Sequence, residues 1–328
     1  MPVNRDQVKK QFGHTLRDTR FSKLGERYQG KVRDTYAGDE LIFLVTTDRI
    51  SAFDHVLRQT IPFKGQVLNR LAAFQFKRTA DIIENHVVSV PDPNVTIARR
   101  CDALPVEFVV RGYLAGHAWR TYDSGVHALC GVKLDEGLRE NSRLSAPILT
   151  PATKADVGHD EDISVDDIVK RGILDRETVD LLTQKSFSLF ERGTQIAANN
   201  ELILVDTKYE FGRLPGGKLI LIDEIHTADS SRYFYSDSYE ELLRLDKPQR
   251  QLSKEFVRVW LMENGFQGFV GQALPDLDDE FVIDISLRYI ELFEKLTGDV
   301  FIPDMHPDPE QRIRENMNKP VANWTVGN

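Results

Sequence analysis

The clearest pattern of apolar and polar positions along the chain is a pair of short apolar runs on either side of a glycine- and proline-rich break. The runs cover residues 202–205 and 219–222, and the break covers residues 212–217. Two runs of this length, separated in this way, predict a β-hairpin with a long loop. We therefore expect two neighbouring strands in this part of the chain.

Every second side chain of a strand points the same way. Charged residues alternate in this manner along the first predicted strand, at Asp206, Lys208 and Glu210. The return strand ends at Asp223, which brings a further acid. Carboxylate oxygens, completed by phosphate oxygens and water, are the ligands that Mg²⁺ requires. The hairpin therefore suggests a magnesium site, although a solvated strand face explains the same residues equally well.

Short strands are predicted mainly in the N-terminal third of the chain and helices mainly in its second half. Runs typical of strands occur at residues 29–36, 41–45, 87–90 and 108–110. Helical spacing of apolar residues occurs at residues 65–85, 176–198, 249–263 and 279–296, and Asp175 is the expected cap of the second helix.

This pattern predicts an α+β fold with two domains. We expect a β-rich N-terminal domain over residues 1–102. A larger α/β domain is expected over residues 103–328, with a helical C-terminal segment from about residue 236. The tail from residue 303 is expected to be loosely ordered or draped over the body.

Composition and charge restrict the partners of this chain. Its 328 residues carry a formal net charge of −9, so a broad basic surface for nucleic acid is not expected. Two cysteines, Cys101 and Cys130, are too few for a disulfide framework and lack metal-ligand spacing, which favours a reducing compartment. No apolar run approaches the ~18 residues of a membrane span, and the polar N-terminus does not resemble a signal peptide. We expect a cytoplasmic protein that binds neither nucleic acid nor membranes.

Two segments of the N-terminal third are candidates for chemistry. Gly30 stands beside Lys31 and Arg33, and such a segment can close its backbone and cations over a polyphosphate. An ordinary charged hairpin is the competing interpretation. Residues 46–54 include many short polar side chains and directly follow an apolar strand. Loops in this position often carry function. Turn formation and capping explain these residues as well.

The middle of the chain holds further candidates. Arg111 ends an apolar strand and is followed by Gly112 and Gly116, and its planar guanidinium can bind a carboxylate or a phosphate through two hydrogen bonds. A salt bridge to a neighbouring acid is the alternative. His117 is either a ligand contact or only the start of a helix. Residues 147–160 contain two prolines and alternating charge, which predicts a long structured loop with a function.

Six motifs join these candidates into one picture. They are GKVRDTY at 30–36, TDRISAFD at 47–54, LPVEFVVRGYLAG at 104–116, TPATKADVGHDEDIS at 150–164, LVDTKYEFG at 204–212 and IDEIHTADSSRYF at 222–234. In this order the chain resembles the SAICAR synthetases, with the arginine strand and the DTKYEFG strand as the specific features. The C-terminal segment resembles the longer form of that family. The resemblance implies a two-domain fold in which a β-rich lid, similar to lobes of kinases and ATP-grasp enzymes, covers ATP.

The resemblance also implies an activity. The family uses ATP and Mg²⁺ to join L-aspartate to the carboxylate of carboxyaminoimidazole ribotide (CAIR), giving SAICAR, ADP and phosphate in purine biosynthesis. A carboxylate is a poor electrophile, so phosphoryl transfer would first convert it into an acyl phosphate, which the amine then attacks. The expected partners are the small molecules CAIR and L-aspartate, and the chain is expected to be a monomer or a small homo-oligomer.

Site residues follow from the resemblance, position by position. The residues assigned to ATP are Gly30, Lys31, Val32 and Arg33 at the phosphates, and Arg100, Cys101 and Ala103 beside the adenine. The metal ligands are Glu210 and Asp223. The catalytic residues are Lys208, Arg111, Lys154 and Asp160. The substrate contacts are Arg111, His117, Arg232 and Asp229 for CAIR, and Ser51 and Asp54 for L-aspartate.

One position departs from the family pattern. The family usually has serine after the second glycine of the arginine segment, whereas this chain has His117. We predict that His117 still contacts the ribotide phosphate, with a strength that depends on pH. The alternative is that the phosphate shifts and His117 only packs.

Two other functions use similar residues. A small-molecule kinase would share the glycine segment, the lysine and the acidic metal ligands, but it needs no second site for an amine. A catalytically inert nucleotide-binding protein would keep the cleft, yet it should have lost one of Lys208, Glu210 or Asp223, which are all present.

Overall fold

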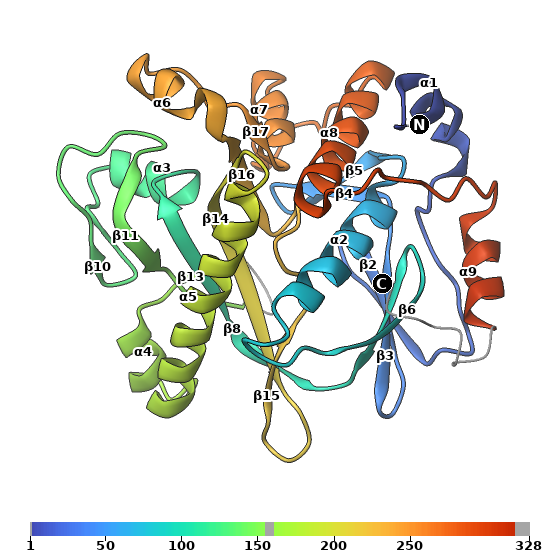
Figure 1. Ribbon diagram of the computed structural model, residues 1–328, viewed down its shortest axis with the longest axis horizontal. Helices are drawn as coiled ribbons and strands as arrows, with labels where there is room; N and C mark the ends of the chain where they lie inside the picture. Colours follow the sequence, from blue (N-terminus) through green and yellow to red (C-terminus); the bar gives the residue numbers. More distant parts are fainter. Residues whose placement is uncertain (1, 155–160, 319–328) are drawn as a thin grey trace. The chain divides into compact units, whose positions relative to one another are not determined.

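The computed structural model describes residues 2–154 and 161–318, which mix helices and strands in an α+β fold (Figure 1). The predicted fold class is therefore confirmed. Contacts divide the chain into two compact units. The first contains residues 2–77, 86–100 and 253–318, and the second contains the described residues of 78–85 and 101–252. Within the described ranges, no helix combines the length and the apolar character needed to cross a membrane.

The first unit is built on a five-stranded antiparallel sheet. In spatial order its strands are β1 (Glu26–Gln29), β2 (Arg33–Ala37), β3 (Leu41–Thr46), β7 (Val95–Arg99) and β6 (Val87–Asp92). A separate hairpin consists of β4 (Arg49–Ala52) and β5 (His55–Thr60). The helices that begin in this unit are α1 (Arg5–Lys10), the short 3-10 helix η1 (Phe12–His14), α2 (Lys64–Arg78), α7 (Glu255–Glu263), α8 (Asp279–Thr297) and α9 (Pro309–Met317).

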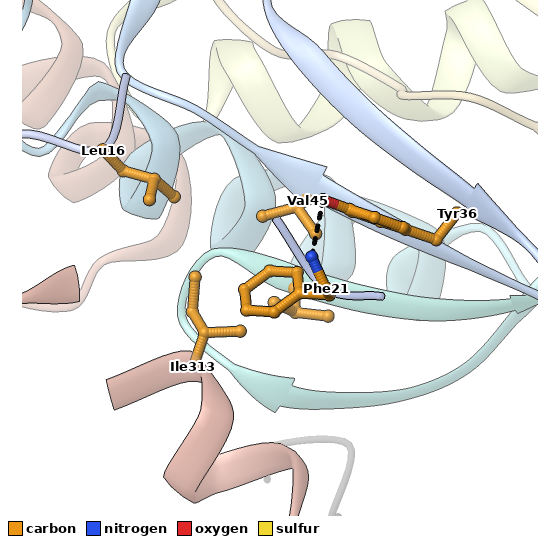
Figure 2. Close-up of a cluster of buried hydrophobic side chains, with 6 residues drawn as sticks. Leu16, Phe21, Tyr36, Val45 and Ile313 are labelled. Carbon is orange, nitrogen blue, oxygen red and sulfur yellow. Dashed lines mark hydrogen bonds between the residues drawn. The ribbon is translucent and has the colours of Figure 1, made fainter. Parts of the chain in front are cut away.

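The C-terminal helices pack with the N-terminal residues of the first unit. Ile313 of α9 is fully buried in one apolar cluster with Phe21 and Tyr36 (Figure 2). Beside it, the Arg312 guanidinium pairs with the buried Asp92 carboxylate, with 3.0 Å between Nε and Oδ2. The contacts thus differ from the sequence-based division, which places residues 253–318 with the second domain. Helix α9 was not predicted, because a tail rich in proline and charge gives little apolar periodicity.

The second unit is built on an eight-stranded sheet. Its two longest strands, β8 (Asp102–Tyr113) and β14 (Leu202–Arg213), pair antiparallel. The other strands of the sheet are β11 (Arg143–Leu149), β12 (Ala152–Thr153), β13 (Glu161–Asp162), β15 (Leu219–Ile222), β16 (Ser231–Tyr235) and β17 (Gln251–Leu252). A separate pair consists of β9 (Ala128–Leu129) and β10 (Val132–Lys133). The helices are α3 (His117–Asp123), α4 (Val165–Lys170), α5 (Arg176–Ala198) and α6 (Ser236–Arg244).

Strands β14 and β15 form the predicted hairpin, with Glu210 opposite Ile222. β14 continues through its charged residues to Arg213, because β8 on one side and β15 and β16 on the other satisfy its backbone. Asp206 is only 7% exposed and Glu210 only 8%. A solvated strand face therefore does not explain these two acids.

Helix α5 begins and ends where the sequence predicts. The Asp175 carboxylate accepts a hydrogen bond from the Thr178 backbone N–H at 2.7 Å, which caps the helix. The helix then packs along β14 (Figure 1). Gly193 allows this close approach, since a Cβ there would lie 2.5 Å from Cε1 of the buried His226 ring and 2.8 Å from Cδ2 of Leu204.

Substitution Gly193→Ala is therefore expected to lower the free energy of unfolding by about 1–3 kcal/mol through overpacking. Intrinsic helix propensity alone would give about 1 kcal/mol in the opposite direction. Urea unfolding decides between the two effects, with Thr194→Ala at the neighbouring exposed position as the matched control. A Gly193→Ala protein that is more stable than wild type would contradict the close packing.

Buried His226 makes the fold sensitive to acid. Burial lowers the pKa of its imidazole from 6.5 to about 3, and its Nε2 lies 2.7 Å from the Tyr209 hydroxyl. The unfolded chain takes up this proton below about pH 6.5 while the folded chain does not, so the stability present above pH 6.5 is lost as the pH falls towards 3. The slope is about 1.4 kcal/mol per pH unit.

We predict that His226→Gln lowers the slope of the free energy of unfolding against pH by about 1.4 kcal/mol per pH unit between pH 5 and 6.5. The measurement is urea unfolding of both proteins at several pH values across this range. Parallel stability–pH curves for the two proteins would show that His226 does not titrate on unfolding.

Candidate active site

Lys208 of β14 lies among three carboxylates of the second unit. Its Nζ is 3.1 Å from Glu107 Oε1 and 3.5 Å from Asp223 Oδ2, and it also forms an ion pair with Glu210. Lys154 pairs with the same Glu210 carboxylate. The structure thus brings together Lys208, Lys154 and both predicted metal ligands.

Strand pairing explains this arrangement. Glu107 on β8 lies directly opposite Glu210 on β14. Like charges at directly opposite positions repel each other, so the pair requires a neighbouring cation. Glu107 was missed from the sequence, where it is a lone acid in the apolar run LPVEFVV.

Asp223 joins the group by leaving the strand. The partner of Glu210 is Ile222, so Asp223 is one residue beyond that register position. Strand β15 ends at Ile222, and Asp223 has a φ of 65°, a left-handed backbone that is uncommon outside glycine. This backbone conformation accompanies the approach of its carboxylate to Lys208.

The electrostatics of the cluster show an excess of negative charge. Burial and the neighbouring Asp223 raise the pKa of Glu210 to about 7, against the lowering effect of Lys208 and Lys154. Burial lowers the pKa of Lys208, but Glu210, Asp223 and Glu107 together raise it well above its ordinary value. When all three carboxylates are ionised, they and the two ammonium groups leave one negative charge.

These residues fit a Mg²⁺ ion that phosphate and water help to coordinate. In the ranges that the structure describes, no three acidic, histidine or cysteine side chains are placed to hold a metal by themselves. Mg²⁺ is ordinarily bound by one or two carboxylates together with substrate phosphates. Glu210 and Asp223 supply two, and a cation between them would relieve the repulsion that raises the Glu210 pKa.

A second group in the same unit holds two arginines against one buried acid. The Arg111 Nη1 is 3.2 Å from Asp206 Oδ2, and Arg232 Nη1 is 3.6 Å from the same oxygen. Arg111 also donates to Thr150 Oγ1 at 2.8 Å. The salt bridge that the sequence left as an alternative for Arg111 is therefore present, and Asp206 is its partner. Burial lowers the pKa of Arg111, and Asp206 opposes this shift.

A glycine makes room for the second arginine. A Cβ at Gly116 would lie 2.3 Å from Nη1 and 2.4 Å from Nη2 of Arg232. Any larger residue would displace this guanidinium. The motif glycine before His117 thus has a steric reason.

His117 begins α3 and is exposed. Its Nε2 lies 2.7 Å from Asp162 Oδ2, and this hydrogen bond lowers the pKa of Asp162. The predicted contact of His117 with the ribotide phosphate stays a prediction. Asp229 lies before β16, where its backbone N–H donates to Thr227 Oγ1 at 3.3 Å. The predicted residue Asp160 lies outside the described residues.

The glycine segment of the first unit is a turn. The sequence predicts one strand over residues 29–36, but β1 ends at Gln29 and β2 begins at Arg33. The Gly30 N–H donates to the Arg33 carbonyl at 2.8 Å and closes the turn, and a Cβ at Gly30 would lie 2.9 Å from that oxygen. Gly30, Lys31 and Val32 therefore form the tight turn between β1 and β2.

This glycine turn lines a cavity of about 510 Å³ in the first unit. The lining residues are Arg17, Asp18, Gln29, Gly30, Lys31, Arg49 and Val56. Lys31 forms an ion pair with Asp54, at the tip of the β4–β5 hairpin. Ser51 lies in β4 of the same hairpin and is buried.

The predicted adenine segment spans the covalent connection between the units. The Arg100 N–H donates to the Glu40 carbonyl at 2.8 Å, and Nη1 of Arg100 donates to the Gly38 carbonyl at 2.8 Å. Neither Cys101 nor Cys130 forms a disulfide. Ala103 lies on β8, where it pairs with Gly212.

Comparison of the sequence with known families gives one match over most of the chain. The sequence model of the SAICAR synthetases matches residues 26–272. A Cytophaga hutchinsonii protein named phosphoribosylaminoimidazole-succinocarboxamide synthase is 54% identical over 308 residues, which are 93% of this chain and 99% of that protein. A Flavobacterium psychrophilum protein of the same name is 47% identical over 314 residues, which are 94% of this chain and 99% of that protein.

Solved structures agree with these sequence matches. A SAICAR synthase from Saccharomyces cerevisiae complexed with SAICAR has a TM-score of 0.75 and 29% identity, covering 88% of this chain and 100% of that chain. A type-2 SAICAR synthetase in complex with ADP has a TM-score of 0.66 and 23% identity, covering 85% of this chain and 100% of that chain, and supports the fold.

Proposed function

The chain belongs to the SAICAR synthetase family, and we propose that the cluster around Lys208 is its metal and phosphate centre. The protein is an ATP-dependent ligase of purine biosynthesis, which joins L-aspartate to the carboxylate of CAIR to give SAICAR, ADP and phosphate. The observation that carries the proposal is the convergence of Glu107, Glu210 and Asp223 on one lysine.

The proposed reaction has two bond exchanges. A carboxylate oxygen of CAIR attacks the γ-phosphorus of ATP, and the bond to the ADP oxygen breaks, which gives an acyl phosphate. The amine of L-aspartate then attacks the acyl carbon, the bond to phosphate breaks, and the nitrogen loses a proton. Both steps bring anions together, so catalysis depends on positioning and on neutralising negative charge.

Lys208 is proposed to neutralise the transferred phosphoryl group. Its raised pKa keeps the ammonium charged throughout the physiological range, and its three N–H donors suit phosphate oxygens. Lys154, which shares the Glu210 carboxylate, is proposed to assist it. When bound, Mg²⁺ held by Glu210 and Asp223 would neutralise charge on the phosphate oxygens. Glu107 would keep Lys208 in place while the other acids turn to the metal.

Arg111 and Arg232 are proposed to anchor the anionic groups of CAIR. Both guanidinium groups lie near the same carboxylate oxygen of Asp206, and two guanidinium groups fixed in this way can bind a carboxylate or a phosphate. Asp229 is proposed to bind a ribose hydroxyl. The role assigned to Asp160 remains a prediction from the sequence.

Residues of the glycine turn, Gly30 to Arg33, are proposed to contact the ATP phosphates. The backbone of residues 100–103 is proposed to contact the adenine. Ser51 and Asp54 are proposed to orient L-aspartate. Lys31 is paired with Asp54, so a phosphate that binds Lys31 would release this carboxylate for the substrate ammonium group.

The function is tested by measuring ADP release with CAIR in the presence and in the absence of L-aspartate. A ligase should release ADP continuously only when both are present. Release that is indifferent to L-aspartate would instead indicate a kinase, and tight ATP binding without turnover would indicate an inert binder. CAIR labelled with ¹⁸O in its carboxylate should pass one label to inorganic phosphate if an acyl phosphate forms.

A separate prediction concerns His117. If its imidazole contacts the ribotide phosphate, protonation should strengthen binding, so the KM for CAIR should rise between pH 6 and 8. In His117→Ser, the serine that the family usually has would remove this dependence. The measurement is the KM for CAIR across this range in both proteins, and the same pH dependence in both would exclude the contact.

A further inference from the structure

Arg49 begins β4 in the first unit, and its side chain is almost completely buried, with 4% exposure. Its guanidinium donates to three backbone carbonyls. Nε donates to Lys31 O at 3.2 Å, Nη2 to Gly30 O at 3.0 Å and Nη1 to Arg17 O at 2.5 Å. Two of these carbonyls belong to the glycine turn.

A neighbouring residue holds the next carbonyl of the same turn. Thr47 binds Val32 O through both its Oγ1, at 2.7 Å, and its backbone N–H, at 3.1 Å. Three successive carbonyls, those of residues 30, 31 and 32, are thus held by the segment 47–49. This gives a structural reason for the start of the TDRISAFD motif, whose turn or catalytic role the sequence left open.

Fixing these carbonyls also fixes the amides of the turn. A trans peptide is planar, and its N–H points away from its C=O. The peptide bonds of the described residues are all trans. The N–H groups of Lys31 and Val32, which share their peptide planes with the carbonyls of Gly30 and Lys31, therefore point away from Arg49. Successive amides in one orientation form the kind of concave site that binds phosphate oxygens.

The charge of Arg49 is already balanced inside the protein. Its Nη2 donates to Asp34 Oδ1 at 2.7 Å, and Asp34 is fully buried. The other oxygen of Asp34 accepts from Arg27 at 3.1 Å and from Thr19 at 2.7 Å. A guanidinium engaged by four protein acceptors acts on the turn and does not need to contact the nucleotide itself. Lysine could not replace it, because its donors diverge from one nitrogen.

We propose that Arg49 is a positioning residue, which sets the orientation of the glycine turn towards the phosphates of ATP. This inference rests on the proposed assignment of the turn to ATP. Thr47 acts in the same way at Val32. Loss of the contacts from Arg49 or from Thr47 leaves the turn free to reorient, which weakens ATP use without touching the proposed CAIR site at Arg111 and Arg232.

The test is the set of three KM values in Arg49→Lys, measured by ADP release. The KM for ATP is expected to rise about tenfold to 100-fold, since misplacement of a binding group by about 1 Å has effects of this size. The KM for CAIR, whose proposed contacts Arg111 and Arg232 do not touch the turn, should stay within about twofold. Thr47→Val, which loses one hydrogen bond of the turn, should give a smaller rise in the same direction. Arg27→Lys is the matched control. Arg27 also binds Asp34, but its other hydrogen-bond partner is Asp18 and not a carbonyl of the turn. The KM for ATP of this variant should not change.

Chemical rescue separates positioning from a general loss of structure. Arg49 lines the 510 Å³ cavity, so removal of its side chain in Arg49→Ala opens a space that solvent can reach. Millimolar guanidinium should lower the raised KM for ATP of this variant, and methylammonium at the same concentration should not. If Arg49→Ala does not fold, the double variant Arg49→Ala with Asp34→Asn also removes the buried carboxylate that Arg49 partly balances, and it should keep the raised KM for ATP.

Three results would overturn the inference: an unchanged KM for ATP in Arg49→Lys, an equal rise of all three KM values, or the same rise in Arg27→Lys. These results are distinct from failure of the proposed function. If the proposed function were wrong, the wild-type protein itself would show no ADP release that depends on both CAIR and L-aspartate.

Discussion

Replacing Glu210 by glutamine is expected to lower kcat, at saturating ATP, CAIR and L-aspartate, by about 100-fold or more. Glu210 is one of two carboxylates proposed to hold Mg²⁺, and a neutral amide is a poorer ligand for this hard cation. The substitution also removes an ion-pair partner from both Lys208 and Lys154. Glutamine matches glutamate in size, so β14 should keep its packing.

The measurement is steady-state ADP release over a range of Mg²⁺ concentrations, with circular dichroism to verify the fold. Glu136→Gln, at an exposed position of the same unit, is the matched control and should retain full activity. Near wild-type turnover of Glu210→Gln with normal Mg²⁺ dependence would remove Glu210 from the metal site.

Replacing Lys208 by methionine is expected to lower the free energy of unfolding by about 3–5 kcal/mol in Mg²⁺-free buffer. The substitution keeps the length of the side chain but takes the shared cation from Glu107, Glu210 and Asp223. Lys154 then remains to balance three carboxylates, of which Glu210 is largely buried. The same variant should also lose activity, because the transferred phosphate loses its proposed contact.

Magnesium should restore part of this stability. A cation that binds only the folded state stabilises it by about 2.7 kcal/mol at a concentration 100 times its dissociation constant. Urea unfolding with and without Mg²⁺ measures both effects. Lys218→Met is the control on the same hairpin, since Lys218 is exposed and pairs with Glu84, and it should cost at most about 1 kcal/mol. Equal stability of the two variants would show that the three carboxylates do not depend on Lys208.

Local patterns were sufficient to predict the elements in which one signal dominates. The hairpin of β14 and β15 was predicted because two apolar runs flank glycine and proline. Helix α5 was predicted with its cap, because Asp175 precedes a long apolar stripe. The class of the fold and the family follow from motifs that such elements carry.

Residues whose importance depends on pairing across the sheet were harder to predict. Glu107 is a single acid in an apolar strand, and only the register of β8 against β14 places it opposite Glu210. A rule that treats every acid in an apolar strand as a candidate would have found it. The sequence does place Asp206 on the charged face of the hairpin, but only the same register shows that Asp206 lies opposite Arg111. The sequence also could not predict how Asp223 reaches Lys208, since this depends on a left-handed residue at the end of β15.

Long-range packing limited the prediction of domains. The tail after residue 303 has few apolar residues, yet Ile313 of α9 completes a cluster with Leu16 and Val45 (Figure 2). Local composition carries no information about a partner almost 300 positions away in the chain. For the same reason, the sequence does not show that Arg49 binds the carbonyls of the glycine turn.

The metal and phosphate centre at Lys208 is tested most directly by titrating Mn²⁺ into the protein with a non-hydrolysable ATP analogue, followed by electron paramagnetic resonance. Mn²⁺ takes the place of Mg²⁺ at oxygen ligands. The proposed ligands predict that the dissociation constant of the bound metal rises about tenfold or more in Glu210→Gln and in Asp223→Asn, and stays unchanged in Glu136→Gln. Wild-type affinity for Mn²⁺ in both ligand variants would contradict the metal site.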